Sequence, residues 1–236
     1  MRIAVLSDLH GNLPFAETAI DTARRSGCDR IVHLGDAIDL GPWPSETLDF
    51  LAAERVEMVR GNHDEYPVMG LTPGVAENLS PDILEHMDWT ASQLRTDQVA
   101  FLAGLPPVIS TRADEWQVRL QHFLLDGNRV SERLVARDPE SMLEAFEVER
   151  GEIVCFGHIH VRTWHYAGDR GFLNPGATGF LGDDGGHVAI LVLQEASAWI
   201  EWSPVHCRHD YVVAEMKRRG VPGWESSANY MFAEAV

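Results

Sequence analysis

Short apolar runs alternate with amphipathic stretches over the first sixty residues. The runs 3–6, 31–34 and 56–59 are mainly apolar, which is typical of strands that are buried on both faces. Between them, residues 14–25 and 45–54 place apolar side chains at helical spacing. Strands and helices that alternate in this way predict right-handed crossovers and a parallel sheet.

The pattern changes after residue 64. Residues 65–80 carry two prolines and two glycines, and we expect a loop there. The remaining elements are predicted from periodicity: helical pieces over 82–104, a strand over 116–122, a helix over 139–149, a strand over 153–156, short β runs over 161–203 and a helix over 208–219 within a helical tail from about 205. No repeat or linker divides the sequence, so we expect a single domain over 1–236.

Polar side chains follow five of the predicted strands at the point where each apolar run ends. They are Asp8 and His10, then Asp36, then Asn62 and His63, then His122, and finally His158 and His160. Because the carboxyl ends of strands in open α/β sheets converge on one crevice, we expect these side chains to lie close together. Glycines that precede Asp36, Asn62 and His158 allow tight turns there. Such ligands suit Mn²⁺, Fe, Zn²⁺, Co²⁺ or Ni²⁺, and a pair of these ions can activate water for phosphoryl transfer.

The ordered motifs resemble those of the calcineurin-like metallophosphoesterase superfamily. The resemblance rests on Asp8-x-His10, Gly35-Asp36, Gly61-Asn62-His63-Asp64, His122 and Gly157-His158-x-His160. The segments 7–12 and 174–176 are similar to its small bacterial and archaeal phosphodiesterase branch, and the likeness runs from residue 3 to about 180. It implies an α/β fold of four layers, αββα, in which two mixed β-sheets pack face to face between helices.

The resemblance also implies a role for each motif residue. Asp8, His10 and His160 would hold one divalent cation, Asn62, His122 and His158 a second, and Asp36 would bridge them. Mn²⁺ is the expected metal, with Fe, Zn²⁺, Ni²⁺ or Co²⁺ as alternatives. The catalytic residues would be His63, which protonates the leaving oxygen or contacts the phosphoryl group, and Asp39, which orients His63.

The residues that contact substrate are less clearly marked. The arginine that the family often supplies after Asn174-Pro175-Gly176 is missing from the loop 177–186, which carries Asp183 and Asp184 instead. By position, the candidates for substrate binding are Asn12, Arg60, Arg129, Arg162 and Asn174. Two of them have a structural alternative, since Asn12 could cap the helix at 14–25 and Asn174 could simply form a turn.

Charge and composition exclude several kinds of binding partner. The net charge is -17 with 19 basic residues, which opposes strong non-specific binding to nucleic acid. Three widely spaced cysteines indicate neither a disulfide scaffold nor a zinc ribbon. The sequence offers no apolar stretch of membrane-spanning length and no signal-peptide pattern, so we expect a cytoplasmic protein without a membrane partner. A homo-oligomer is compatible with the sequence.

These features predict a hydrolase of phosphodiesters or phosphoanhydrides that uses a metal-bridging hydroxide. Its partner would be a small phosphorylated substrate, with nucleotides such as dinucleoside polyphosphates or cyclic nucleotides among the candidates. A phosphomonoesterase or protein phosphatase is one alternative, which Asp39 favours and Leu40 opposes, because protein phosphatases have an arginine at that position. A non-catalytic scaffold on the same fold is a second alternative, which the complete ligand set opposes. The loop 65–80 could form a lid over the site or a dimer contact.

Overall fold

A computed structural model describes residues 1–113, 115–131, 133–182 and 185–232. Its first sheet has five strands in the order β12-β11-β1-β2-β3. Their bounds are β1 (Arg2–Leu6), β2 (Arg30–His33), β3 (Glu57–Met58), β11 (His187–Gln194) and β12 (Ser197–Pro204). The first three strands run parallel, as predicted, and β11 and β12 add an antiparallel edge.

The second sheet also has five strands, in the order β4-β5-β8-β10-β9. The strands are β4 (Val108–Ala113), β5 (Trp116–Gln121), β8 (Glu152–Cys155), β9 (Thr163–Tyr166) and β10 (Arg170–Asn174). The central strands β5, β8 and β10 are parallel, and β4 and β9 pair antiparallel at the two edges. A small hairpin of β6 (Leu125–Asp126) and β7 (Arg129–Val130) lies outside both sheets.

The two sheets pack face to face on a shared apolar core. Ile3 and Val5 of β1 belong to the same buried cluster as Val118 of β5 and Ile153 of β8. Ala4 and Leu6, which alternate with Ile3 and Val5 along β1, belong to a second cluster that includes buried side chains of the helices. Since successive side chains of a strand point to opposite faces, the continuous apolar run 3–6 reflects burial on both sides.

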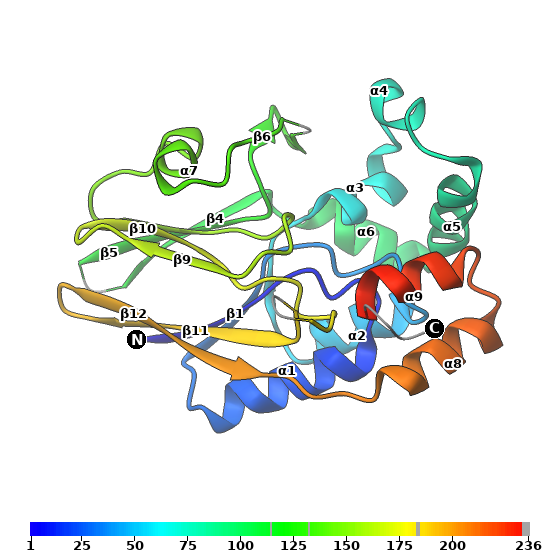
Figure 1. The fold of residues 1–236 in the computed structure, drawn as a ribbon, viewed down its shortest axis with the longest axis horizontal. Coiled ribbons are helices and arrows are strands. Elements are labelled where there is room, and N and C mark those ends of the chain that lie inside the picture. The colour runs from blue at the N-terminus through cyan, green and yellow to red at the C-terminus, as the bar shows by residue number, and fades with distance from the viewer. Residues whose placement is uncertain (114, 132, 183–184, 233–236) are drawn as a thin grey trace.

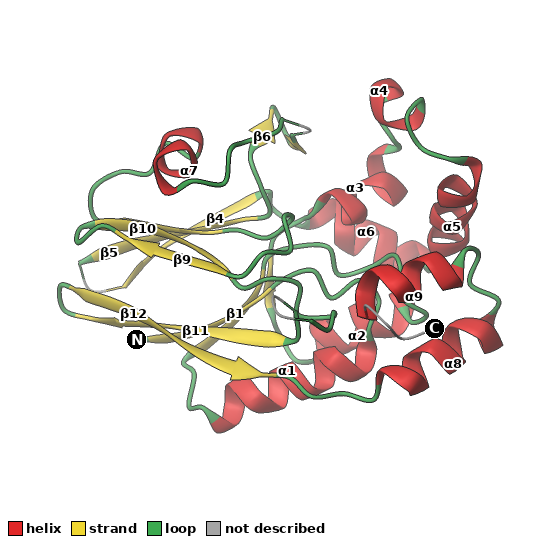
Figure 2. Ribbon diagram, viewed as in Figure 1, coloured by secondary structure: helices red, strands yellow, loops and turns green. Residues whose placement is uncertain are grey.

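Helices complete the four layers (Figure 2). The outer face of the first sheet packs on α1 (Leu13–Arg25), α2 (Pro44–Ala53), α8 (His209–Arg219) and α9 (Trp224–Phe232). A thinner layer covers the second sheet, where Met142 and Leu143 of α7 (Pro139–Ala145) pack against Phe156 and Phe172. The predicted αββα sandwich with two mixed sheets is therefore confirmed.

Four more helices lie between β3 and β4, toward the end of the sheets where β1 and β2 end (Figure 1). They are α3 (Asn62–Met69), α4 (Pro73–Ala76), α5 (Pro81–Ser92) and α6 (Thr96–Gly104). Helix α9 extends into the same region (Figure 1). In the described part of the chain, no helix is both long and apolar enough to cross a membrane.

The prediction of a loop over 65–80 was wrong for most of this stretch, and only residues 70–72 and 77–80 lie outside helices. Residues 62–69 and 73–76 form α3 and α4. The Asp64 carboxylate accepts a hydrogen bond from the Gly61 N–H, and Asp64 and Glu65 place two acids in the first turn of α3, where they favour helix formation. Pro73 occupies the first position of α4, where a proline is tolerated.

The other predicted helices occur with shifted ends. Helix α7 stops at Ala145 rather than at 149, and Glu147 takes a left-handed φ of 49° that a helix cannot continue through. The tail from about 205 contains α8, as predicted, and a further helix, α9.

Candidate metal centre

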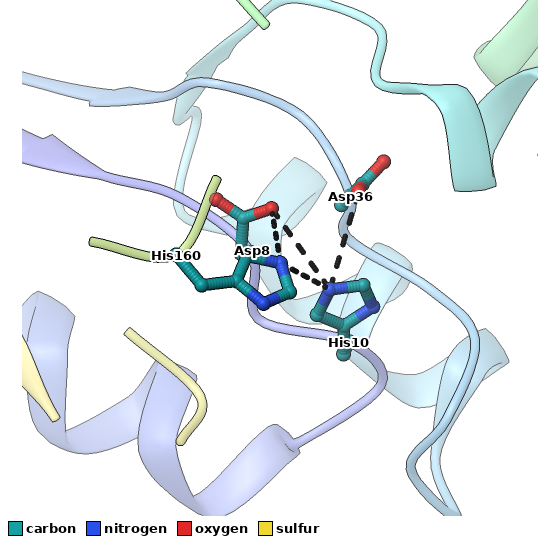
Figure 3. Close-up of side chains that lie close together, drawn as sticks. All are labelled: Asp8, His10, Asp36 and His160. Atoms are coloured by element: carbon teal, nitrogen blue, oxygen red, sulfur yellow. Dashed lines mark hydrogen bonds and ion pairs between the residues drawn. The ribbon is translucent and has the colours of Figure 1, made fainter. Parts of the chain in front are cut away.

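Side chains from distant segments meet at the carboxyl ends of the parallel strands. One group comprises Asp8, His10, Asp36 and His160, and a second comprises Asp36, His122 and His158. Within each group the ligand atoms lie within 4.8 Å of one another, and Figure 3 shows the first. The predicted convergence is therefore confirmed. Asp36 belongs to both groups, so its carboxylate is placed to bridge two cations.

The first group brings together atoms that attract a cation. The Nε2 atoms of His10 and His160 lie 3.3 Å apart, and His160 Nε2 lies 3.1 Å from Asp8 Oδ1. The other ring nitrogen of His160, Nδ1, lies 3.1 Å from the Tyr230 hydroxyl. When Nδ1–H donates to this hydroxyl, Nε2 presents a lone pair to the carboxylate. The lone pairs of these atoms repel one another, and a cation bound between them would be stabilised by all of them.

The second group also brings together atoms that attract a cation. Nδ1 of His122 donates to the Leu34 carbonyl over 2.8 Å. Its Nε2 then faces Asn62 Oδ1 at 3.0 Å and Asp36 Oδ2 at 3.1 Å, and both of these atoms are acceptors. His158 Nδ1 also lies 2.9 Å from Asn62 Oδ1, which brings Asn62 into this group as predicted. Burial lowers the pKa of His122, but Asp36 outweighs this effect and raises the pKa to about 9. Metal binding would therefore displace a proton from Nε2.

The backbone at the candidate ligands is strained. Positive φ angles occur at Asp8, His10, Asp36, His158 and His160, with values of 53°, 49°, 59°, 68° and 53°. Non-glycine residues rarely adopt this region, and such strain concentrates at functional sites. Gly61 leaves room for the Asp36 side chain, since a Cβ on Gly61 would overlap the Asp36 carboxylate.

Asp64 connects the loops that carry the ligands, although the resemblance to the superfamily implied no role for this residue. It is fully buried, and it accepts hydrogen bonds from the backbone N–H groups of Asp36, Ala37 and Gly61 at 2.8, 3.0 and 2.9 Å. These bonds tie the loop after β2 to the loop after β3. Its position as the fourth residue of Gly61-Asn62-His63-Asp64 was the only signal in the sequence.

The predicted pair of His63 and Asp39 is formed. His63 Nδ1 lies 2.5 Å from Asp39 Oδ2. Burial lowers the pKa of His63, but the carboxylates of Asp36 and Asp39 outweigh this effect and raise the pKa to about 10. His63 therefore holds a proton at neutral pH, and its Nε2 lies 4.0 Å from Asp36 Oδ2.

Asp39 has two further partners that the sequence did not reveal. Its Oδ1 accepts from the Thr90 hydroxyl at 3.2 Å and lies 3.0 Å from His86 Nε2. The other nitrogen of His86 donates to the Pro222 carbonyl over 2.7 Å. His86 thus connects α5 and the segment before α9 to the pair that includes His63.

A cavity of about 560 Å³ opens over the two groups. Its floor includes His10, Asp36, Asn62 and His63, and its walls come from α5 and α9. A smaller cavity of about 240 Å³ adjoins it, and Asn62 and His63 line both. The volume of the larger cavity is typical of sites for small molecules.

Two of the predicted substrate residues are fully buried and bind backbone. Asn12 donates to the Gly179 carbonyl over 2.8 Å, and its side chain makes no cap bond to α1. Asn174 donates to the Gly157 carbonyl and accepts from Gly176 N–H, at 2.7 and 2.8 Å. Asn174 therefore forms the turn that was its structural alternative, and it also fixes the residue before His158.

The three predicted arginines lie apart from the large cavity. Arg60 is buried and donates to the carbonyls of Leu105 and Asn128. Arg162 Nη1 lies 2.8 Å from His187 Nε2, and its guanidinium lies over the Trp202 ring. Arg129 lines the smaller cavity, where it faces Glu65. Arg129 therefore shares a cavity with Asn62 and His63.

The fold and the strand-end side chains define a class of protein: a two-sheet α/β sandwich with a candidate site for two metal ions. The chain matches the family model of the calcineurin-like phosphoesterase superfamily domain over residues 1–196. It therefore belongs to this superfamily, whose members depend on metal ions.

Solved structures share this fold, and one curated protein is similar in sequence. A metallophosphoesterase from Sphaerobacter thermophilus shares the fold with a TM-score of 0.74 and 24% identity, over 98% of each chain. The hypothetical protein PH1004 from Pyrococcus horikoshii OT3 has a TM-score of 0.78 and 17% identity, over 98% of this chain and 97% of that one. The uncharacterized protein MJ0912 of Methanocaldococcus jannaschii is 27% identical over 159 residues, which are 67% of this chain and 62% of that protein. The matched region thus spans less than two thirds of this relative.

Proposed function

We propose that the protein is a metal-dependent hydrolase that cleaves phosphodiesters or phosphoanhydrides of small substrates. The observation that carries this proposal is the position of Asp36, which is shared by two ligand groups on the floor of a cavity. A pair of divalent cations, with Mn²⁺ as the first candidate, would supply an activated water and stabilise charge on the phosphoryl oxygens. Asp8, His10 and His160 would hold one ion, and Asn62, His122 and His158 the other.

His63 is the proton donor of the proposed reaction. Its Nδ1 is held by Asp39, and its raised pKa keeps a proton on Nε2 at neutral pH. His63 lines the cavity beside the candidate ligand Asn62. A leaving oxygen that approaches Nε2 can take the proton as the P–O bond breaks.

The alternative of a phosphomonoesterase draws support from the same contact, because Asp39 lies where protein phosphatases have the acid that orients this histidine. Both reactions need the same metal centre and the same proton donor. The two reactions differ in the negative charge of the substrate, which the side chains lining the cavity must accommodate.

A hydrolysis screen with added Mn²⁺ tests the proposal, together with the metal content of each sample. We expect metal-dependent cleavage of at least one class of phosphate ester, reversed by a chelator. The Asp36→Asn variant should lose both metal and activity, whereas Asp88→Asn, at an exposed position of α5, should keep both. A protein that binds no divalent metal, or that retains activity in Asp36→Asn, would contradict the proposal.

A further inference from the structure

Besides the candidate metal ligands, the large cavity is lined by a wall of apolar and hydroxyl-bearing side chains from the regions of α5 and α9. The apolar side chains are those of Leu79, which precedes α5, Ile83 in the first turn of α5, and Pro222, which precedes α9. Hydroxyl groups come from Ser80, Ser226 and Ser227. Ile83 keeps 47% of its surface exposed, so it offers apolar area to a bound group. Such a wall suits an organic group with a few polar atoms.

The charges around the cavity oppose a second phosphate. Neither lysine nor arginine occurs among its lining residues in the described part of the chain, whereas Asp82 adds a carboxylate to Asp36 and Asp39. The imidazoles of His63 and His86 are already engaged, since both lie against the Asp39 carboxylate. A phosphate at the α5 and α9 wall would therefore meet negative charge without a cation to offset it.

The amino end of α5 does not offer a phosphate site either. The Ser80 hydroxyl accepts from the Ile83 N–H over 3.4 Å, and Asp82 lies in the first turn. A carboxylate there offsets the positive end of the helix dipole. In the smaller cavity, Arg129 Nε lies 3.7 Å from Glu65 Oε2, and the guanidinium also donates to the Gly70 carbonyl. The positive charge of Arg129 is therefore already paired with groups of this chain.

We propose that the cavity takes the uncharged aryl or nucleoside group of a phosphodiester, and that Asp82 discriminates against monoesters and polyphosphates. This inference rests on the proposed function and narrows it. A diester carries one negative charge, which the metal centre can neutralise, so its organic group is all that the α5 and α9 wall must accept. A monoester dianion places a second negative charge on the phosphoryl group, and a polyphosphate places further charges along the cavity. Asp82 adds negative potential that opposes both.

The reaction stops after one step on such a substrate. Water adds its oxygen to phosphorus, one ester P–O bond breaks, and the leaving oxygen takes the proton from His63 Nε2. One proton of the water restores His63, and the other passes to solvent as the phosphomonoester ionises. The products are an alcohol or phenol and a phosphomonoester, whose second negative charge makes it a poor substrate for this cavity.

The test compares four compounds with the Mn²⁺-loaded protein: p-nitrophenyl thymidine 5′-phosphate, bis(p-nitrophenyl) phosphate, p-nitrophenyl phosphate and diadenosine tetraphosphate. We expect kcat/KM for the two diesters to exceed that for the other two compounds by about tenfold or more. Bis(p-nitrophenyl) phosphate should release a single equivalent of p-nitrophenol, and p-nitrophenyl phosphate should accumulate.

Two variants test the role of charge. Asp82→Lys on α5 and Ser226→Lys on α9, both at positions that line the cavity, should each reduce the diester-to-monoester ratio of kcat/KM by about threefold or more. Glu85→Lys makes the same charge change as Asp82→Lys, on an exposed position of α5 that does not line the cavity, and it should leave the ratio unchanged. Thermal unfolding of each variant would show that the fold is retained.

The outcomes separate this inference from the proposed function. Metal-dependent hydrolysis with the monoester or the tetraphosphate as the best substrate would overturn the inference and leave the proposed function standing. Equal ratios in the wild type, Asp82→Lys and Ser226→Lys would also overturn it. If none of the compounds is cleaved with any divalent metal, the proposed function itself fails.

Discussion

The hydroxyl of Tyr230 lies 3.1 Å from Nδ1 of His160, although the two residues are 70 positions apart in the chain. Tyr230 belongs to α9, and its ring also packs edge-on against Phe180. The contact fixes which nitrogen of His160 faces Asp8. The C-terminal helix is therefore part of the candidate metal centre and supports a ligand from outside.

Removing this hydroxyl should weaken metal binding. We expect Tyr230→Phe to reduce the affinity for Mn²⁺ by about tenfold, because partners that orient a ligating histidine typically contribute that much. Calorimetric titration of the metal-free protein measures the effect directly. Tyr211→Phe, at another tyrosine of the C-terminal helices, is the matched control and should bind as the wild type does. Equal affinities for all three proteins would show that the Tyr230 contact has no such role.

Asp64 should matter for stability more than any exposed acid. Its replacement by alanine leaves three buried N–H groups without their acceptor. We expect Asp64→Ala to lower the free energy of unfolding by about 3 kcal/mol. Urea unfolding of the metal-free protein measures this change, and Asp88→Ala provides the comparison at an exposed site. A loss of similar size in both variants would argue against the bridging role of Asp64.

The ion pair of His86 with Asp39 should make stability depend on pH. Burial lowers the pKa of His86, but the contact with Asp39 outweighs it and raises the pKa above its usual 6.5. A raised pKa means that the contribution to stability is complete below about pH 6.5 and declines as pH rises through the higher folded-state value. His63, which also faces Asp39, lowers the pKa of His86 slightly, and the Pro222 carbonyl raises it.

Urea unfolding of the metal-free wild type and His86→Gln, at about pH 6 and about pH 9, tests this dependence. The difference in unfolding free energy between the two proteins should be larger at the lower pH. If the difference is the same at both values, or larger at the higher pH, His86 is not charged against Asp39 in the folded state.

His63 should be needed for turnover but not for metal. In His63→Gln, kcat should fall by about a hundredfold or more, because the leaving oxygen loses its proton donor. The metal content should remain that of the wild type, since His63 belongs to neither ligand group. Asp39→Asn should give a smaller loss of kcat, because it changes how the imidazole is held and leaves the imidazole itself in place. Metal-loaded His63→Gln that turns over at the wild-type rate would refute the assigned role.

The sequence predicted the parts of the site that depend on strand ends. Asp8, Asp36 and His158 could be placed together because parallel strands end on one edge, and the apolar runs before them are distinctive. The resemblance to the superfamily, rather than this reasoning, implied two sheets packed face to face. The alternation of strands and helices predicted the parallel strands β1, β2 and β3, and the strand ends predicted where the ligands gather. These features are set by local pattern and by general geometry, so they need no knowledge of side-chain packing.

What the sequence missed depends on packing between distant segments. Tyr230 has no motif around it, and it reaches His160 only because α9 folds back across the site. Arg60 looked available by position, yet the carbonyls of Leu105 and Asn128 take its donors. In the region 65–80, prolines and glycines suggested a loop, but the Asp64 cap outweighed them at the start of α3.

The most direct test of the account is electron paramagnetic resonance of the Mn²⁺-loaded protein, with the number of ions per chain measured on the same sample. If Asp36 bridges the two ligand groups, the spectrum should show two exchange-coupled ions in the wild type, and the coupling should disappear in Asp36→Asn. A single uncoupled Mn²⁺ per chain in the wild type would contradict a shared centre built around Asp36.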